Sequence, residues 1–302
     1  MSAYANSGLA PGWPSPDLRV VPIETIWLHE NPDPSRSLAL ITAFKQREVL
    51  ENPVVVSPAM ATTSSHRKFV HLDGANRLIA LRALGCTHVV VQVVDLHQPQ
   101  QVSLSTWAHS THVEADDFFR YLQRLPGVDI QPLSQAGEPI AESTAAFIFC
   151  PQGAYQFSLR QPTIANRIEM LQMLVAFYGR RIERYKLPLW PESQVVAEHL
   201  APGVPGAPCP VLITFVPLQA VEFLELVAQG IQAPPGVTRF ALRGGRAIGV
   251  NMPLALLRPG TNTRSAETLL DPLRAAQPQI IPGPCRRLEY LGWREYDEEE
   301  PI

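Results

Sequence analysis

One stretch of the chain combines residue types in an order that suits phosphate chemistry. Asp73-Gly-Ala-Asn-Arg77 follows the apolar segment Phe69–Leu72 and opens a helical segment that ends near Gly85. Gly74 can adopt backbone angles that a side chain forbids, and the free N–H groups at the start of a helix attract anions. Arg77 would add a fixed cation. An acidic residue before glycine is more often an ordinary turn, but the flanking strand, helix and arginine favour a phosphate-binding turn.

The elements expected around this turn alternate between strands and helices, which predicts an α/β or α+β fold for the first part of the chain. We expect strands at 19–22, 53–57, 69–72 and 89–94, and helices at 38–48, at 75–85 and near 115–125. Proline, glycine and glutamine in segment 126–141 predict a linker.

The second half is also expected to mix helices and strands. A hairpin is predicted at 145–150 and 155–159, helices at 164–178, 192–200 and 218–229, a strand at 211–216, and two short strands within 234–250. A Gly-Gly turn joins the last two strands, and the flanking Arg243 and Arg246 are expected to be exposed. The predicted organisation is a flexible tail 1–17, a first lobe 18–130, a second lobe 131–295 and an acidic tail 296–302.

Composition limits the classes of function. The chain has 302 residues, 46% of them hydrophobic and 18% charged, which predicts a globular protein of two lobes. Its 25 Lys and Arg against 28 Asp and Glu give a net charge of −3, which argues against a nucleic-acid partner. Four scattered cysteines predict reduced thiols, and the lack of a signal segment or long apolar run predicts a cytoplasmic protein without a membrane anchor.

Three further segments carry a resemblance to a known family. They are Val20-Val-Pro-Ile-Glu-Thr-Ile-Trp-Leu-His-Glu30 followed by Arg36, Ser105-Thr-Trp-Ala-His109, and Pro235-Gly-Val-Thr-Arg-Phe240 with Pro253-Leu-Ala-Leu-Leu257. Together with the Asp-Gly-x-x-Arg turn, they resemble the ParB/sulfiredoxin-like superfamily, and within it the siderophore-associated free serine kinases. The resemblance spans roughly residues 18–257.

The resemblance implies a ParB-like nucleotide-binding lobe and a second mixed α/β lobe that closes the substrate cleft. It implies transfer of a phosphoryl group from ATP or ADP, with Mg²⁺, to free L-serine, so that O-phospho-L-serine forms and feeds 2,3-diaminopropionate and siderophore-type synthesis. Glu30 would be the base that accepts the serine hydroxyl proton. The other site residues implied are Asp73 as a catalytic residue and Mg²⁺ ligand, Gly74, Ala75, Asn76, Arg77 and Arg36 for the phosphates, and Trp107, Thr238, Arg239 and His109 for serine.

Several alternatives stand beside this reading. Many superfamily members have histidine where this chain has Asn76, which keeps a non-catalytic DNA-binding or nucleotide-sensing regulator as a rival. A kinase for another small hydroxyl compound is a third possibility. Sulfiredoxin chemistry is disfavoured because Ala75 stands where its cysteine would be. Considered alone, Glu30 would be a solvated carboxylate, His29 and His109 satisfied structural histidines, and Trp107 a core residue.

Overall fold

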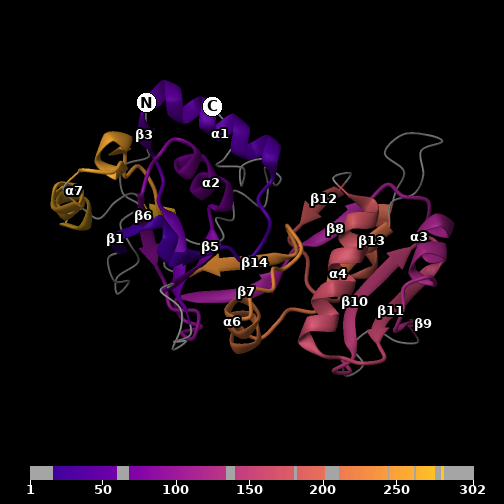
Figure 1. Ribbon diagram of the computed structural model, residues 1–302. Helices are drawn as coiled ribbons and strands as arrows, with labels where there is room; N and C mark the ends of the chain where they lie inside the picture. Colours follow the sequence, from indigo (N-terminus) through magenta and orange to yellow (C-terminus); the bar gives the residue numbers. More distant parts are fainter. Residues whose placement is uncertain are drawn as a thin grey trace, which may run out of the picture. The chain divides into compact units, whose positions relative to one another are not determined.

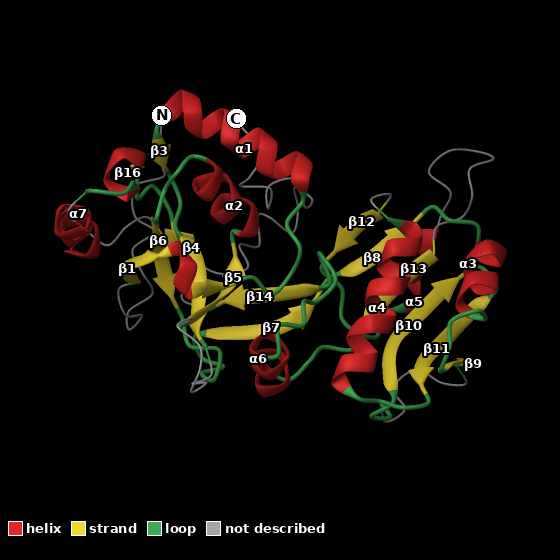
Figure 2. Ribbon diagram, in the orientation of Figure 1, coloured by secondary structure: helices red, strands yellow, loops and turns green. Residues whose placement is uncertain are grey.

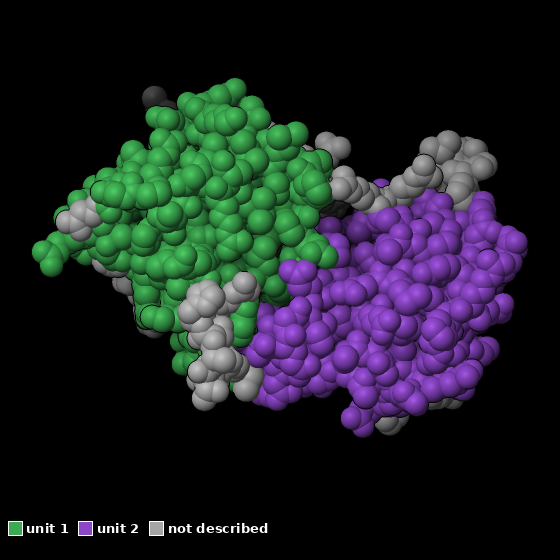
Figure 3. Space-filling view, in the orientation of Figure 1, with its two compact units in different colours: residues 1–103, 240–302 green, residues 104–239 purple. Residues whose placement is uncertain are grey.

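The computed structural model describes residues 16–59, 68–133, 140–179, 182–200, 211–243, 245–261, 263–275 and 280–281. The predicted acidic tail 296–302, and residues 1–15 of the predicted tail 1–17, lie outside these ranges. The described part forms two compact units, coloured separately in Figure 3. Unit 1 comprises residues 1–103 and 240–302, and unit 2 comprises residues 104–239.

These boundaries differ from the predicted lobes 18–130 and 131–295. The segment after residue 240 returns to unit 1, where β16 (Met252–Pro253) pairs with β3 (Val49–Leu50). Leu254 and Leu257 then enter the core of unit 1. A local hydrophobic pattern shows that a segment is buried but not which core it joins, so the sequence alone did not reveal this return.

Unit 1 is built on a five-stranded mixed sheet with the order β1-β6-β4-β5-β2 (Figures 1 and 2). The pairs β1–β6 and β4–β5 are antiparallel, and the pairs β6–β4 and β5–β2 are parallel. The strands span Asp17–Pro22 (β1), Ile26–Trp27 (β2), Val54–Pro58 (β4), Phe69–Asp73 (β5) and His88–Val93 (β6). β-branched residues dominate β4 and β6, which lie inside the sheet and are almost fully buried.

Helices complete unit 1. Helix α1 (Pro34–Arg47) packs beside α2 (Ala75–Ala83), and α7 (Thr263–Ala275) packs beside β1 (Figure 1). The predicted start of α1 at residue 38 was four residues late. Asp33 caps the helix by accepting a hydrogen bond from the Ser35 backbone N–H at 2.8 Å, and Pro34 occupies the first helical position. The remaining short elements of unit 1 are η1 (Ile23–Thr25), β15 (Arg246–Ala247), η2 (Leu254–Leu257) and β17 (Ile280–Ile281).

Unit 2 contains a six-stranded antiparallel sheet with the order β12-β8-β13-β10-β11-β9. The strands span Ala108–Thr111 (β8), Val128–Pro132 (β9), Thr144–Cys150 (β10), Gly153–Leu159 (β11), Ile182–Tyr185 (β12) and Val211–Phe215 (β13). The helices span Ala115–Leu122 (α3), Ile164–Tyr178 (α4), Ser193–Leu200 (α5) and Ala220–Ala228 (α6). The predicted hairpin and the predicted helix 164–178 are confirmed.

Both faces of this sheet are covered. For this reason every residue of β10 is buried. Ile148 and Cys150 point to a core shared with α3 and α4, whereas Phe147 and Phe149 point to a second core on the opposite face. There the Phe147 and Trp190 rings lie 3.9 Å apart between centroids. Successive residues of a strand face opposite sides, so two covered faces require a continuous apolar run.

Two segments differ from their predicted structures. Part of the predicted linker 126–141 forms β9, the edge strand of the unit 2 sheet. The segment around Trp107, expected to join a strand to a helix, instead joins strands β7 (Val102–Thr106) and β8. β7 pairs with β14 (Thr238–Leu242), and the chain passes between the units within these two strands. Among the helices in the described ranges, none is long and apolar enough to span a membrane.

Candidate active site

The predicted phosphate-binding turn lies in unit 1, where β5 ends at Asp73 and α2 begins at Ala75. Gly74 between them has φ +99°, in the region that L side chains rarely adopt. A Cβ atom added there would lie 3.1 Å from both Val54 Cγ2 and Arg77 Nε. The turn therefore requires glycine for its backbone angles and for space. No side chain caps the amino terminus of α2.

Asp73 lies between two arginines. Its Oδ2 accepts hydrogen bonds from Arg77 Nη2 and Arg246 Nη1, each at 2.5 Å. Burial alone would raise the pKa of the carboxyl group, but the charges of Arg246 and Arg77 outweigh it and hold that pKa well below its usual range. Asp73 is therefore a carboxylate at all ordinary pH values. The expectation that Arg246 is merely an exposed residue beside a turn was wrong, because its side chain is 25% exposed and ion-paired.

Arg77 points into unit 1. Its side chain is 6% exposed, and Nη1 donates to the Pro53 and Asn52 carbonyl oxygens at 2.8 and 3.3 Å. Arg77 Nε is buried and has no hydrogen-bond partner among the described residues. It lies over Gly74, where a Cβ would come within 3.1 Å of it. The other donors of Arg77 bind the carbonyl oxygens of loop 52–53 and the Asp73 carboxylate.

Asn76 also points inward. Its Oδ1 accepts hydrogen bonds from the Asp33 backbone N–H at 2.9 Å and from Ser37 Oγ at 3.0 Å. These bonds tie α2 to the first turn of α1, the turn that also carries the half-buried Arg36. Ala75 is the first residue of α2 and is buried.

Glu30 has a side chain that is 25% exposed and lies in unit 1 beside a buried histidine pair. The His29 backbone N–H donates to His71 Nδ1 at 3.0 Å, so the proton of the neutral His71 ring lies on Nε2. His29 Nδ1 lies 2.8 Å from the His71 carbonyl oxygen, which can only accept, so this nitrogen carries the His29 proton. His29 Nε2 then carries no proton, and this atom lies 3.9 Å from Glu30 Oε2.

This arrangement keeps a neutral ring beside the proposed base. Burial lowers the pKa of His29, and this effect outweighs the opposing charge of Glu30. Because the His29 ring is neutral, it does not form an ion pair with the Glu30 carboxylate. His29, Glu30 and His71 each offer a ligand atom, and these atoms lie within 4.8 Å of one another. His71 does not fit a metal ligand, because one ring nitrogen accepts a hydrogen bond and the other carries the proton.

The residues predicted to bind serine all lie in unit 2. Arg239 lies over the Trp107 ring, 5.1 Å from its centroid, and Nη1 donates to Ser105 Oγ at 3.3 Å. The Trp107 backbone N–H donates to the Val237 carbonyl oxygen at 2.9 Å, next to Thr238. Trp107 and Arg239 are thus in contact, and both are partly exposed.

His109 has a different environment from the other three. It is fully buried, and its Nδ1 and Nε2 lie 2.8 Å from the Tyr178 hydroxyl and the Gly236 carbonyl oxygen. Burial lowers the pKa of His109 to about 3. These contacts match the structural alternative given above, in which His109 is a satisfied structural histidine.

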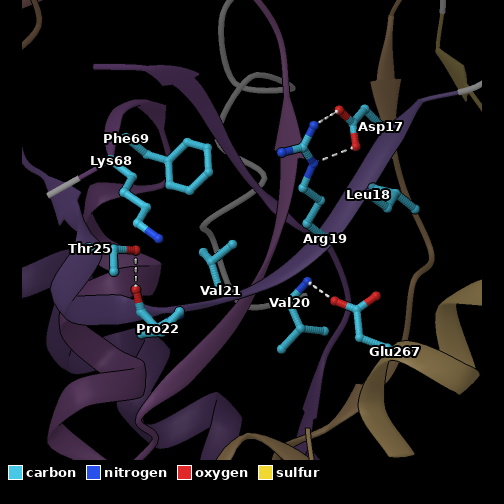
Figure 4. Close-up of a pocket in the computed structure, with 10 residues that line it drawn as sticks. All are labelled: Asp17, Leu18, Arg19, Val20, Val21, Pro22, Thr25, Lys68, Phe69 and Glu267. Atoms are coloured by element: carbon cyan, nitrogen blue, oxygen red, sulfur yellow. Dashed lines mark hydrogen bonds and ion pairs between the residues drawn. The ribbon is translucent and has the colours of Figure 1, made fainter. Parts of the chain in front are cut away.

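A cavity of about 610 Å³ lies elsewhere in unit 1, along β1 and α7 (Figure 4). Val20 donates its backbone N–H to Glu267 Oε1 at 2.8 Å there, and Phe69 contributes from the start of β5. Asp73 is at the opposite end of β5. No predicted site residue lines this cavity.

The chain is similar to known proteins in sequence and in structure. No family model matches the chain. The sequence is 28% identical, over 249 residues, to the ATP-dependent L-serine kinase SbnI of Staphylococcus aureus (strain NCTC 8325 / PS 47), a match that covers 80% of this chain and 84% of that protein. The chain is a homologue of SbnI. The structure of SbnI with a C-terminal truncation matches with a TM-score of 0.64 and 25% identity, over 84% of this chain and 95% of that chain.

The match to SbnI confirms the resemblance to free serine kinases. A free serine kinase in complex with AMP matches with a TM-score of 0.60 and 17% identity, over 82% of this chain and 96% of that chain. At this identity the likeness concerns the fold. The predicted α/β fold class is confirmed, and the ParB-like superfamily assignment is consistent with these matches.

The structure adds residues that the sequence analysis missed. Arg246 joins Asp73 from a position 173 residues away in the chain. His71 fixes the orientation of His29. One sign of this role is visible in the sequence, which is that His71 stands next to Leu72 in a buried strand. No local spacing could have revealed either contact, because both depend on the tertiary fold.

Proposed function

We propose that the protein is a kinase that transfers the γ-phosphoryl group of ATP to the hydroxyl of free L-serine. Its homology to an ATP-dependent L-serine kinase is the observation that carries this proposal, because the match covers 80% of the chain and therefore both units. The Gly74 turn supports it independently, since it combines an uncapped helix terminus with a surplus of positive charge.

Glu30 is the proposed general base. It is a partly exposed carboxylate beside a ring that stays neutral, so it can accept the proton of the serine hydroxyl as the oxygen attacks the γ-phosphorus. The bond from the γ-phosphorus to the bridging oxygen breaks, and ADP leaves. The backbone N–H groups of Ala75 and Asn76 would stabilise negative charge on the phosphates. Arg36, in the first turn of α1, would supply a further cation.

Serine recognition is assigned to unit 2. Arg239 has the charge and planar geometry to bind the amino-acid carboxylate, and its contact with Trp107 keeps the guanidinium oriented. We propose that the reaction takes place in the cytoplasm and that its product feeds 2,3-diaminopropionate and siderophore-type synthesis, as the resemblance to the siderophore-associated branch implies.

Phosphorus NMR tests the activity. The purified protein is incubated with L-serine, Mg²⁺ and either ATP or ADP, and the O-phospho-L-serine resonance is expected with ATP. Absence of the product with both donors, in a protein that remains folded, would contradict the proposal and favour another acceptor or the regulator. The two donors in parallel also identify which nucleotide is used.

Glu30→Gln tests the base. The substitution keeps the size of the side chain but removes its basicity, so kcat is expected to fall about 100-fold or more while the affinity for ADP stays within about twofold. Glu24→Gln is the matched control, because Glu24 is an exposed glutamate of the preceding η1 turn. Turnover of Glu30→Gln equal to that of the control would remove Glu30 from this role.

A further inference from the structure

Two arginines share Asp73 but differ in how accessible they are. The Arg77 side chain is 6% exposed and the Arg246 side chain is 25% exposed. Arg77 also donates to the Pro53 carbonyl oxygen at 2.8 Å, and moving its guanidinium would leave that buried acceptor unsatisfied. Arg246 is therefore the guanidinium of this pair that an incoming ligand can reach.

Buried contacts hold the backbone on both sides of Arg246. Gln92 of β6 is 5% exposed, and its Nε2 donates to the Gly245 carbonyl oxygen at 3.0 Å while its Oε1 accepts from the Ala247 N–H at 2.9 Å. One side-chain amide thus fixes the residues before and after Arg246. The side chain then extends to Asp73, whose carboxylate orients the guanidinium beside the Gly74 turn.

The charges at the turn add up to a site for an anion. One carboxylate faces two guanidinium groups, and the amino terminus of α2 adds positive potential. Arg77 Nε contributes a buried N–H that lacks a partner among the described residues and lies next to Gly74. A phosphate bound at the turn would neutralise this surplus of positive charge.

Asp73 does not fit the predicted role of Mg²⁺ ligand. Its Oδ2 already accepts two hydrogen bonds at 2.5 Å from fixed cations, and a divalent ion bound to the same carboxylate would lie close to both. In this environment Mg²⁺ is better held by the phosphates of the nucleotide itself.

We infer that Arg246 binds the phosphate groups of the nucleotide and that Asp73 is a positioning residue for Arg246 rather than a metal ligand. This inference rests on the proposed nucleotide site and adds two roles to it. The contact would supply a partly exposed, oriented cation beside the backbone N–H groups of α2, as phosphoryl transfer needs.

Calorimetric titration with ADP tests the first role, because it reports binding without requiring transfer to serine. Arg246→Ala is expected to weaken ADP binding about 10- to 100-fold, the usual effect of losing a hydrogen bond to a charged group. Arg243→Ala, which removes an exposed arginine three residues away, is the matched control and should stay within about twofold. An ADP affinity of Arg246→Ala equal to that of this control would overturn the assignment.

Asp73→Asn tests the second role in buffers with Mg²⁺ and with EDTA. If Asp73 acts through Arg246, the loss of ADP affinity persists in EDTA, and the Asp73→Asn/Arg246→Ala double variant binds ADP no more weakly than Arg246→Ala alone. If Asp73 is a metal ligand, EDTA abolishes the difference from wild type and overturns the inference. Failure of serine phosphorylation in the wild-type protein would contradict the proposed function while leaving these binding results valid.

Discussion

Asn76 stands where many superfamily members have histidine, and its side chain makes two structural contacts there. Its side-chain oxygen accepts two hydrogen bonds from the first turn of α1. The position therefore requires a neutral acceptor, and a charge is not needed for these contacts. The substitution is compatible with the fold of unit 1.

The buried side chain of His109 makes the free energy of unfolding depend on pH. His109 is fully buried with its pKa lowered to about 3, whereas the pKa of an unfolded histidine is about 6.5. The unfolded state therefore binds a proton first as the pH falls, so the stabilising contribution is present above pH 6.5 and is lost as the pH falls from 6.5 toward 3. From pH 7.5 to 5.5 this one group lowers the free energy of unfolding by about 1.4 kcal/mol.

Urea unfolding at pH 7.5 and 5.5 measures this effect. His109→Gln is expected to be less stable than wild type at pH 7.5, because hydrogen bonds are lost, but its further loss at pH 5.5 should be smaller by about 1.4 kcal/mol. His97→Gln, at an exposed position, serves as the control and should keep the wild-type dependence. An unchanged pH dependence in His109→Gln would show that this ring is not buried as a neutral group.

Helix α2 carries the site at the scale of an element, and a glycine stands at each of its ends. Gly74 has φ +99° and is crowded, whereas Gly85 has φ +76° and has no atom within 4 Å of an added Cβ. The backbone angle alone would account for glycine at position 85. At position 74 the close approach of Val54 and Arg77 adds a second requirement.

The two glycines give a matched pair of variants. Gly85→Ala is expected to lower the free energy of unfolding by about 1 kcal/mol through backbone strain alone, and Gly74→Ala by about 3 kcal/mol because the Arg77 and Val54 side chains must also move. Only Gly74→Ala should weaken ADP binding. Urea unfolding and calorimetry check both statements, and equal losses of stability in the two variants would contradict the crowding argument.

At the scale of the whole molecule, the predicted nucleotide residues lie in unit 1 and the predicted serine residues in unit 2. This division makes substrate effects separable. Arg239→Ala is expected to raise the KM for serine about tenfold or more, since an ion pair with the carboxylate is lost, while the affinity for ADP stays within about twofold. Steady-state kinetics with varied serine and ADP titration measure the two quantities.

Arg124→Ala controls for the loss of a positive charge from unit 2, because Arg124 is exposed. A serine KM that is equal in the Arg239 and Arg124 variants would remove Arg239 from serine recognition. A parallel loss of ADP affinity in Arg239→Ala would contradict the separation of roles between the units.

The local features of this protein could be predicted from its amino-acid sequence. The β-branched run of β6, the apolar spacing of α4 and the Gly74 turn follow from neighbouring residues, because burial patterns and positive φ angles leave a signature within a few positions. The family resemblance rests on short motifs of the same kind, and the homology to SbnI confirms it.

Contacts between residues far apart in the sequence depend on the tertiary structure. It returned the segment after residue 240 to unit 1, brought Arg246 to Asp73 and stacked His71 against His29. It also turned Arg77 and Asn76 inward, although their sequence positions suggested ligand contacts. Such contacts depend on strand order and on the packing of distant segments, and neither leaves a periodic pattern in the sequence.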